Sequence, residues 1–558
     1  MKKSFMKNSM INLMSKIVLM SLIIGFGLAS CKDYLNVIPT SVVSNLTTWT
    51  STANADLFLN AIYGSVPDQT NTIEDEEYYS ENIMNNYGGT ASRTYNLSSY
   101  TPSTGIAGWG QIDMWSYYKN IRECNVFIAN VTASNLDDSW KTLRVAEAQY
   151  LRAYFYYLLY THFGGVPIIT DVLDITTQGD AIFRARNTPE ETFQFIDAEC
   201  IAAANDLPAT TTDFGRATKG AALTLKGVCE LFHASPLYNT ANDLSQWALA
   251  ASTCKEVMDL SVYSLFPNLA TLFFEENNNN SEEIFYKGAK GGTSLGGSRE
   301  GLRGPQALNG IQLSYGCENP TQEIVDQYFM ANGLPITDPA SGYDPQNPYV
   351  NRESRFYNDI VYNGGTWGVN TFYFYDGSQT ATDLSDANAN SNTGYWFKKG
   401  LNPKWWQNGS NMLSSANWVI FRYAEVLLSY AEAQNEAIGP DASVYSAINA
   451  IRERSQLPDL QAGLTQDQMR IAIRHERTVE LAFETKHWLD IIRWKTAETV
   501  LNGTVHAMEI SVVNGINVYT VVPAAAGTRI FYANKNYVFP IPQAAIDQNS
   551  KLVQNPNY

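Results

Sequence analysis

Residues 292–296 have the sequence GTSLG, which satisfies the G-x-S-x-G pattern of a nucleophile elbow and would make Ser294 an attacking hydroxyl. That motif needs a strand before the serine and a helix directly after it. Residues 282–288 could form the strand, but GGSREGLRGPQ, which follows, contains four glycines and a proline and is a poor helix. We therefore interpret the match as a chance feature of a Gly-rich loop and expect no catalytic residue.

Carboxylates and metal ligands give no clearer site. Two carboxylates about 5–10 Å apart could hydrolyse a glycosidic bond, but spacing along the sequence does not single out such a pair. The run EDEEYY (Glu74–Tyr79) is predicted to be a solvated loop, and it lacks the spacing of a known calcium loop. The chain has no CxxC or HExxH motif and its five histidines do not cluster. We expect no cofactor and no transition-metal site.

Cys31 ends a segment typical of export signals. Four lysines precede Ile17–Ala29, a stretch of 13 residues that is apolar except for one serine. A membrane-spanning helix needs about 20 apolar residues, and a signal-peptide core about 7–15. The sequence LASC at residues 28–31 is typical of a bacterial lipobox, whose cysteine is lipidated after cleavage. We predict a signal peptide over residues 1–30 and a lipid anchor on Cys31; a secretory signal with an incidental cysteine is the alternative.

The composition excludes one class of partner. The formal net charge is −17, and removing residues 1–30, which hold four lysines and no acid, takes it to −21. Such a chain repels nucleic acid, so we expect no nucleic-acid partner. Charged residues are only 17% of the chain, which suits a surface for neutral polar ligands.

The five cysteines after Cys31 include no close pair, and four lie in helical patterns, so we predict that they are small core residues rather than a disulfide framework.

Several segments have the periodicity of helices. Apolar residues recur three or four apart in Trp115–Val131, and residues 143–165 are apolar nearly all round after Tyr150, which indicates a largely buried helix. Thr188 and Pro189 are suited to the N-cap and first turn of the next helix. Further helices are predicted at residues 215–236, 245–260, 417–437, 441–458 and 465–484. In the last, Arg477, Glu480 and Glu484 share a face and are predicted to form structural ion pairs.

These alternating helices predict a mainly α scaffold of helix pairs similar to tetratricopeptide repeats, at about residues 52–261 and 417–500. Residues 262–416 have a different composition, and they are rich in Gly, Asn, Pro and aromatic residues. Structureless loops longer than roughly 12–15 residues are usually functional or disordered, and the aromatic residues argue against disorder. Aromatic rings stack on sugar rings, and amides and arginines bind hydroxyls, so this region is predicted to bind ligand.

Nine segments, in order along the chain, resemble the SusD/RagB family of outer-membrane nutrient-binding lipoproteins of Bacteroidetes. They are CKDYLNVIP, EAQYLRAYFYYLLYTHFGGVPI, GRATKGAALTLKGVCELFHASP, ENPTQEIVDQYFMANG, TGYWFKKGLNP, FRYAEVLLSYAEAQNEA, INAIRERSQLP, ERTVELAFETKHWLDIIRW and NYVFPIPQAAIDQNSKLVQNPNY. The sequence departs from the family pattern in two places. Residues 352–355 are RESR where Arg-Asp-Pro-Arg is usual, and His487 stands where arginine is usual. Both are predicted to be structural.

The resemblance implies ligand-contacting residues. In glycan-binding members of the family, the ligand lies on loops equivalent to those before the Trp115 helix and in the middle region. Carried onto this chain, that placement implies a glycan site formed by Tyr87, Arg93, Tyr95, Trp109, Tyr315 and Trp367. Trp396 and Trp406 fall in or near family segments and are predicted to be structural.

The resemblance also implies the function. We expect a cell-surface lipoprotein, anchored in the outer membrane through Cys31, that binds an oligosaccharide or polysaccharide and delivers it to a SusC-like TonB-dependent transporter. Three alternatives stay open: a peptide-binding member of the same family, a secreted hydrolase using the loop-rich region, and a helical-repeat adaptor that binds only protein.

Overall fold

The structure is a computed structural model, and it describes residues 48–68, 75–85, 87–108, 113–289, 299–308, 311–312, 314–375, 391–406 and 414–558. The chain divides into two compact units, Met1–Asp56 and Leu57–Tyr558. Apart from the start of the first helix, the features described below lie in the second unit. Cys31, Trp109 and Ser294 lie outside the described residues.

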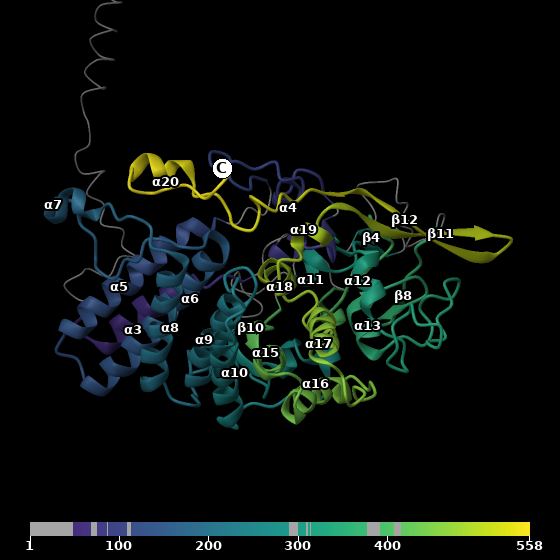
Figure 1. Cartoon of the computed structure of the whole chain (residues 1–558), viewed down its shortest axis with the longest axis horizontal. Helices are drawn as coiled ribbons and strands as arrows, with labels where there is room; N and C mark the ends of the chain where they lie inside the picture. Colours follow the sequence, from purple (N-terminus) through teal and green to yellow (C-terminus); the bar gives the residue numbers. More distant parts are fainter. Residues whose placement is uncertain are drawn as a thin grey trace, which may run out of the picture. The chain divides into compact units, whose positions relative to one another are not determined.

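Most long elements are helices (Figure 1). They are α3 (Thr52–Gly64), α5 (Tyr117–Ala133), α6 (Asp138–Phe163), α8 (Pro189–Asp206), α9 (Lys219–Ala234), α10 (Leu244–Asp259), α15 (Tyr423–Ile438), α16 (Ala442–Arg454), α17 (Gln466–Glu480) and α18 (His487–Arg493). The predicted fold class, mainly α, is confirmed.

The long helices pack in succession. α5 contacts α6, α6 contacts α8, α8 contacts α9, α9 contacts α10, and α10 contacts α15, which also contacts α16 and α17. The row can be followed in Figure 1 from α5 to α17. The predicted helix pairs are therefore present, and they bring the helices before residue 261 into contact with those after residue 417.

Local signals in the sequence set the helix ends. At the start of α8, Thr188 Oγ1 accepts a hydrogen bond from Glu191 N at 3.1 Å, and Glu191 Oε2 accepts one from Thr188 N at 2.8 Å, which completes a capping box. α6 ends at Gly164, whose φ of 74° is open to glycine. The cysteines of α5, α8, α9 and α10 are buried and unpaired, as predicted.

The remaining elements are short apart from β11 and β12, and they lie in the loop-rich region, in the connections between scaffold helices and after α18. The strands are β1 (Ile83–Asn85), β2 (Glu283–Lys287), β3 (Ala307–Leu308), β4 (Ile311–Gln312), β5 (Glu318–Pro320), β6 (Ile360–Val361), β7 (Thr366–Trp367), β8 (Asn370–Thr371), β9 (Trp396–Phe397), β10 (Trp418–Arg422), β11 (Gly503–Val513) and β12 (Ile516–Arg529). The short helices are α4 (Ala91–Asn96), α7 (Ile175–Gln178), α11 (Arg299–Arg303), α12 (Gln322–Gln327), α13 (Ser354–Asp359), α14 (Pro403–Trp406), α19 (Ala497–Val500) and α20 (Gln543–Gln548). Single 3₁₀ turns are η2 (Glu76–Tyr79), η3 (Met114–Ser116), η4 (Gly179–Ile182), η5 (Leu269–Thr271) and η6 (Glu275–Asn277).

The loop-rich region has a hydrophobic core of its own. The core contains Tyr328, Phe356 and Trp396 from this region, and it continues onto Phe483, after α17, and Met508 of β11. Trp396 is fully buried, which agrees with its predicted structural role. The aromatic residues that argued against disorder therefore fold part of the region onto the helical scaffold.

Residues 417–422 are not helical, contrary to the prediction for 417–437. Residues 418–422 form β10, which pairs antiparallel with β2, with Trp418 opposite Lys287. The helix α15 starts only at Tyr423. Because β2 lies far away in the sequence, local periodicity does not reveal this pairing. The two strands mark the beginning and end of most of the loop-rich region.

A buried ionic cluster surrounds Glu480. Its carboxylate accepts hydrogen bonds from Arg422 Nη1 at 2.8 Å, from Arg355 Nη1 at 3.2 Å and from Arg454. Burial opposes ionisation, but these guanidinium groups hold the pKa of Glu480 well below its usual range. The cluster continues through Glu282, Glu353, Glu476, Glu484, Lys399 and Arg452. The predicted structural pairing of the α17 charges is confirmed, although Arg477 pairs with Asp490 at 3.1 Å rather than with Glu480.

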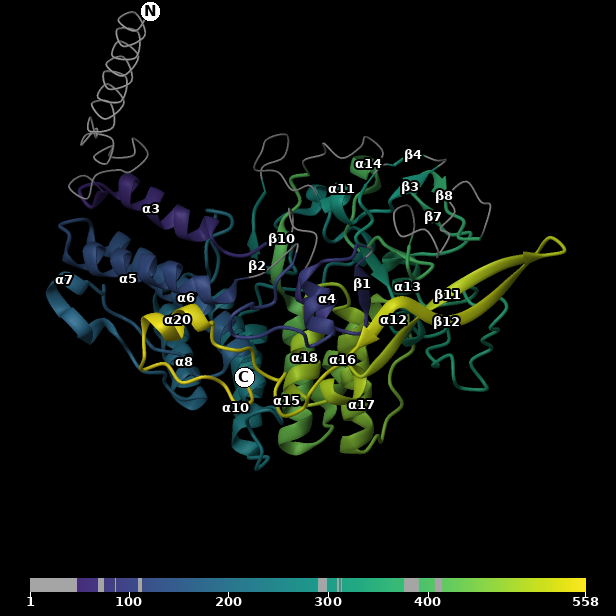
Figure 2. The ribbon, with the colours of Figure 1, turned by 90° about the horizontal axis from the view of Figure 1, so that it is seen from above.

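A long hairpin, β11–β12, was not predicted. It projects from the rest of the second unit in the view of Figure 2. Its turn is Asn514-Gly515, with φ values of 53° and 80°, and Asn-Gly between β-branched residues is a strong hairpin signature. The middle of β11 is fixed to the loop-rich region, since Met508 N donates to the Thr393 carbonyl at 2.9 Å.

Candidate functional site

A two-stranded sheet brings together two of the predicted ligand residues, Tyr87 and Tyr315. β1 pairs with β5, with Asn85 opposite Glu318, so the residues just after β1 meet those just before β5. The Tyr87 phenol donates a hydrogen bond to the Tyr315 carbonyl at 3.1 Å, and Tyr87 N donates to Asn85 Oδ1 at 2.9 Å. The Tyr315 side chain is 47% exposed, and Tyr87 is half-buried. We refer to these two residues together as the Tyr87–Tyr315 ledge.

The backbone of the ledge is held on both sides. Tyr315 N donates to the Gly301 carbonyl of α11 at 2.9 Å. Gly316 has a φ of 58°, and a Cβ there would come within 2.8 Å of Gln306 Cβ, so only glycine lets the chain turn here without displacing its neighbour. Burial, with smaller contributions from Cys317 and Tyr315, raises the pKa of Tyr87 to about 12, which keeps its phenol a hydrogen-bond donor.

A buried ion triad lies beneath the ledge. Arg303 Nη2 donates to Asp75 Oδ2 at 2.7 Å and Arg303 Nη1 donates to Glu318 Oε1 at 2.6 Å, and none of the three side chains is more than 1% exposed. Asp75 also accepts from Glu77 N at 2.8 Å and so caps η2. The prediction of a solvated loop at Glu74–Tyr79 is therefore wrong for the described residues 75–79. The carboxylate of Asp75 is inside the protein because Arg303 compensates its charge.

Arg93 lies on α4, near the base of the hairpin. Its Nη1 donates to the Ala526 carbonyl of β12, and its side chain is half-buried. The loop that follows α4 packs back against this helix, since Thr94 Oγ1 donates to the Ala107 carbonyl at 2.7 Å. A Cβ on Gly108 would come within 2.4 Å of the Thr90 carbonyl carbon, so this contact requires glycine. These contacts place the residue before Trp109 beside the helix that carries Arg93.

Tyr95 and Trp367, also predicted to contact ligand, lie in packed clusters. The Tyr95 ring is 3% exposed, its centroid lies 4.3 Å from that of Tyr79, and its hydroxyl accepts a 2.9 Å hydrogen bond from Trp488 Nε1. Trp367 is 7% exposed within the core of the loop-rich region. Neither side chain joins the exposed ledge of Tyr87 and Tyr315.

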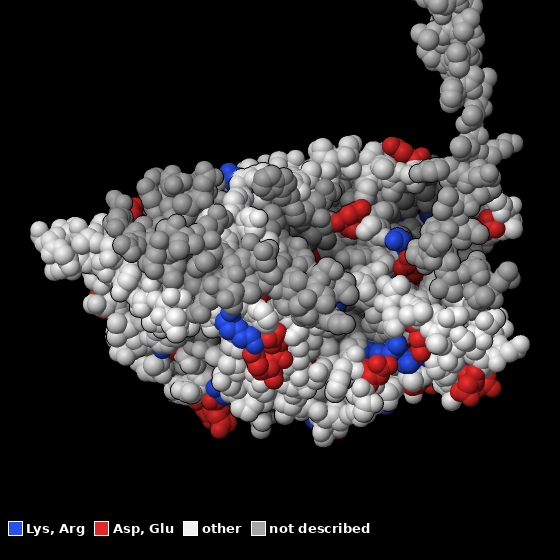
Figure 3. Space-filling model, turned by 180° about the vertical axis from the view of Figure 1, so that it is seen from behind, with Lys and Arg blue, Asp and Glu red and all other residues white. Residues whose placement is uncertain are grey.

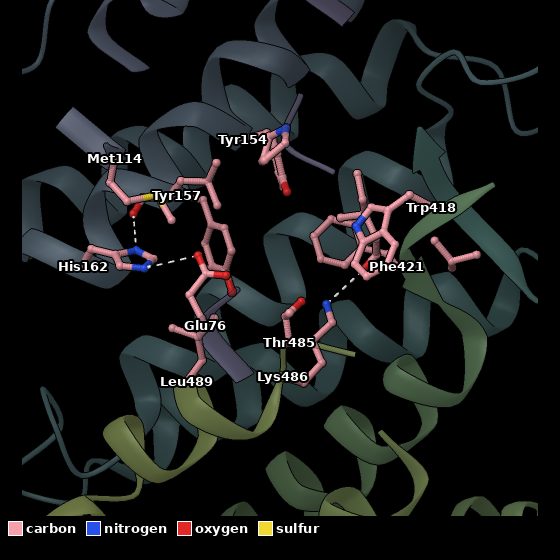
Figure 4. Close-up of a pocket in the computed structure, with 14 residues that line it drawn as sticks. Glu76, Met114, Tyr154, Tyr157, His162, Trp418, Phe421, Thr485, Lys486 and Leu489 are labelled. Atoms are coloured by element: carbon pink, nitrogen blue, oxygen red, sulfur yellow. Dashed lines mark hydrogen bonds and ion pairs between the residues drawn. The ribbon is translucent and has the colours of Figure 1, made fainter. Parts of the chain in front are cut away.

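A small pocket of about 90 Å³ lies among α6, β10 and the residues after α17 (Figure 4). Glu76 Oε1 faces His162 Nε2 at 3.7 Å, and His162 Nδ1 donates to the Leu158 carbonyl at 2.7 Å. Burial raises the pKa of Glu76 to about 7 and lowers that of His162 to about 4. Lys486, on the opposite wall, pairs with Glu425 at 2.9 Å. The residues are too scattered along the chain for sequence spacing to reveal this pocket.

This pocket has the size and chemistry to hold water or a small hydroxyl group. The charge of Lys486 is compensated by Glu425, and the rest of the described lining is mainly apolar and aromatic. Within the described part of the chain, no group of three or more His, Cys, Asp or Glu side chains is placed to hold a metal ion. Nor does any helix in those ranges have the length and hydropathy needed to cross a membrane.

One face of the molecule is largely uncharged. In the view of Figure 3, most described atoms belong to residues other than Lys, Arg, Asp and Glu, and several basic groups lie next to acidic ones. This face is hollowed near its centre. A neutral surface of this kind favours hydrogen bonding and ring stacking over recognition of a charged ligand.

Two family descriptions match this sequence. The one described as "SusD family" covers residues 275–558, and the one described as "Starch-binding associating with outer membrane" covers residues 33–226. A SusD-like protein of Formosa agariphila, named P2, is 28% identical, with 84% of this chain and 85% of the relative aligned. A SusD-like protein of Bacteroides ovatus is 27% identical over 68% of this chain and 65% of its own length.

Solved structures have the same fold. A SusD-like protein of Bacteroides fragilis superposes with a TM-score of 0.77 at 26% identity, covering 92% of this chain and 99% of its own. A second protein of that species, described as a SusD-like carbohydrate binding protein, gives 0.74 at 25% identity, covering 91% of this chain and 100% of its own. Surface glycan-binding protein A of Bacteroides fluxus shares the fold at 19% identity, with a TM-score of 0.64 over 91% of this chain and all of its own. From the family match over half its length and from its fold, the chain belongs to the SusD family.

Proposed function

We propose that the protein is a cell-surface lipoprotein that binds an oligosaccharide or polysaccharide and delivers it to a SusC-like TonB-dependent transporter of the outer membrane. As a member of the SusD family it is a binding protein rather than an enzyme. The description of one matching family as starch-binding and the name of a carbohydrate-binding relative support a glycan as the ligand.

The observation that carries the proposal is that Tyr315 exposes its ring on a backbone that is held by hydrogen bonds. Its carbonyl accepts from Tyr87, its N–H donates to Gly301, and its side chain is 47% exposed. An aromatic ring whose backbone is already ordered can stack on a sugar ring with little further loss of conformational entropy. We assign Tyr87, Arg93, Trp109 and Tyr315 to the ligand surface.

The expected affinity is modest. Two or three stacked rings, at roughly the 1–3 kcal/mol that aromatic stacking contributes to base binding, leave a few kcal/mol after the cost of association. That range corresponds to dissociation constants of micromolar to millimolar. A receptor that must release its cargo for import works well in this range.

The proposal is tested with the chain from Asp33 onward, by affinity electrophoresis through gels containing neutral polysaccharides. Tyr315→Ala and Trp109→Ala should each weaken retention by about tenfold, equivalent to about 1.4 kcal/mol. Tyr532→Ala is the matched control, because Tyr532 is 51% exposed and lies outside the ledge. Release of shortened products would favour a hydrolase, and retention by peptides alone would favour the peptide-binding alternative.

The transporter is tested separately. Gentle detergent extraction of the tagged full-length protein should recover a TonB-dependent transporter. Deleting that transporter should abolish uptake and leave surface glycan binding intact. Recovery of the tagged protein alone, with normal uptake in the deletion strain, would refute the pairing.

A further inference from the structure

Two adjoining hollows, neither of which is lined by Tyr87 or Tyr315, lie between the loop that precedes α9 and strand β2. Their volumes are about 240 Å³ and about 380 Å³. Both are lined by Phe214, Gly215 and Arg216 of the loop and by Tyr286 of β2. A ligand lying across these shared residues would occupy both hollows at once.

The shared wall presents aromatic surface to solvent. The Phe214 side chain is 67% exposed, although exposure of such a ring is unfavourable. Tyr286 is half-buried, and a Cβ on Gly215 would lie 3.9 Å from its Cε2 atom, so its ring is close to the loop. Burial, followed by the charge of Glu283, raises the pKa of Tyr286 to about 12. Its phenol therefore stays neutral, and it donates to Asn279 Oδ1.

Two side-chain amides border the rings. Asn60 Oδ1 accepts from Arg216 Nη2 at 2.9 Å, and Asn279 Oδ1 accepts from Tyr286. Each amide is thus fixed through its oxygen, and neither Nδ2 group donates to another described residue. Both asparagines are exposed. The amides keep donors for a ligand that carries hydroxyl acceptors. Hydroxyls of Thr210 and Ser281 lie on the lining of the smaller hollow.

The charges around the hollows are compensated within the protein. Arg216 Nη1 pairs with Glu147 at 2.9 Å, and its guanidinium lies 5.7 Å from the centroid of the Tyr63 ring. Lys287 pairs with Asp68 at 2.6 Å. These pairs leave a surface of rings, amides and hydroxyls with no dominant charge.

The acids of the lining are also paired or hydrogen-bonded. Asp213 pairs with Arg216, and Glu283 accepts hydrogen bonds from asparagines. Burial raises the pKa of Glu283 to about 7, and its carboxyl accepts from Asn417 Nδ2 at 2.9 Å and from Asn279 N at 3.0 Å. Its hydrogen bonds therefore hold the Asn279 backbone in place beside Tyr286. The combination of one exposed ring, a second ring at the floor and fixed amide donors matches the faces and hydroxyls of a neutral sugar chain.

We propose that these two hollows form a second binding site, separate from the Tyr315 ledge, for a neutral oligosaccharide. Phe214 and Tyr286 contact the apolar faces of successive sugar rings, and the amides of Asn60 and Asn279 donate to their hydroxyls. The class of ligand rests on the proposed function, whereas the position of the site does not depend on Tyr315. Binding one long polysaccharide at two places raises its apparent affinity through effective concentration.

The test uses affinity electrophoresis of the chain from Asp33 onward in amylopectin, laminarin, xyloglucan, galactomannan and xylan, with alginate as an anionic comparison. Variants are Phe214→Ala, Asn279→Asp, which replaces the Nδ2 donor by an acceptor and keeps the oxygen bound by Tyr286, and Tyr315→Ala, with Tyr532→Ala as control. For the polysaccharide that retains the unaltered protein, Phe214→Ala and Asn279→Asp should each weaken retention at least threefold, and Phe214→Ala combined with Tyr315→Ala should weaken it more than either alone.

Hydrogen exchange locates the site independently. The same polysaccharide should slow exchange of backbone amides in residues 209–218 and 279–287, and should still do so in Tyr315→Ala. Unchanged retention of Phe214→Ala and Asn279→Asp, with no protection of these segments, overturns the second site and leaves the proposed function standing if Tyr315→Ala binds weakly. Failure of the unaltered protein to bind any of the neutral polysaccharides overturns the proposed function and this site together.

Discussion

The phenol of Tyr87 donates a 3.1 Å hydrogen bond to the carbonyl of Tyr315, a residue 228 positions later in the chain. This contact joins the segment after β1 to the segment before β5 at the point where the ring of Tyr315 faces solvent. The position of that ring therefore depends in part on the hydrogen bond from Tyr87.

We predict that Tyr87→Phe weakens glycan binding by roughly two- to tenfold, because a neutral hydrogen bond contributes about 0.5–1.5 kcal/mol. The ring stays in place and only the donor to the Tyr315 carbonyl is lost. Isothermal titration with the polysaccharide fragment that binds the unaltered protein measures the change. Tyr532→Phe serves as control, and a Tyr87→Phe variant that binds like the unaltered protein would remove the phenol from the site.

Removing Arg303 should destabilise the protein strongly. Arg303→Met leaves Asp75 and Glu318 buried without their cation, and breaking one partner of a buried pair costs about 3–5 kcal/mol. Lys255→Met is the matched control, because Lys255 and its partner Asp259 are 47% and 63% exposed, and such surface pairs contribute only about 0–1 kcal/mol. The comparison is made by urea denaturation. Equal effects of the two substitutions would show that the triad does not stabilise the fold.

The pH dependence of stability should contain a contribution from His487. Burial alone would lower its pKa, but Glu81 at 2.9 Å, with further contributions from Glu77 and Asp490, raises it to about 9. The folded pKa lies above the unfolded value of about 6.5, so the stabilisation is fully present below about pH 6.5 and is lost as the pH rises through about 9. The loss is about 2–4 kcal/mol.

His487→Arg should reduce this fall, because a guanidinium stays protonated across the range. His487→Gln should be less stable than the unaltered protein at pH 6 and approach it at pH 9. Thermal unfolding midpoints at pH 6, 7.5 and 9 provide the measurement. Taking differences between variants removes the contribution of Glu76, whose raised pKa of about 7 also lowers stability as the pH rises. Parallel curves for His487→Arg and the unaltered protein would contradict the assignment.

Membrane attachment should depend on one sulfur atom. Cys31→Ala is expected to move the full-length protein from the membrane fraction to the soluble fraction, or to leave an uncut precursor, because the acyl chains provide the anchor. Cell fractionation and intact-mass measurement report both outcomes. Cys124→Ala, at a buried core cysteine, is the control for loss of a thiol. Unchanged fractionation and mass of Cys31→Ala would refute the lipid anchor.

The features predicted correctly from sequence depend on local interactions. The capping box of Thr188 and Glu191 is complete within four residues, and the apolar surface of α6 extends nearly all round the helix, so periodicity and capping are enough to place both helices. The sequence also predicts that the charges on α17 are paired, because buried charges need partners. It does not identify the partners of Glu480, which are Arg355, Arg422 and Arg454.

The features missed depend on contacts between residues far apart in sequence. Asp75 lies inside the protein because Arg303 neutralises it, and Tyr95 is buried because Trp488 donates to its hydroxyl. Trp418–Arg422 is a strand because β2 provides its partner. The hollows beside Phe214 and Tyr286 combine a helix end, a loop and a strand, and no spacing pattern links them. The β11–β12 hairpin is an exception among the missed features, because its Asn514-Gly515 turn is a hairpin signature that the sequence itself contains.

The pairing of Trp418 with Lys287 has a consequence for how new specificities arise. The intervening segment, which carries Tyr315, leaves the helical scaffold at β2 and returns to it at the adjacent strand β10, and Arg422 fastens the return point to Glu282 at 2.6 Å. A segment that leaves and returns at adjacent strands can be exchanged as a cassette, provided that the new segment keeps the buried ion pairs of Arg355 with Glu476 and of Lys399 with Glu484. Recombination between relatives at these strands would therefore transfer the Tyr315 half of the ledge in one step, which also makes residues 288–417 the natural unit for building chimaeric receptors.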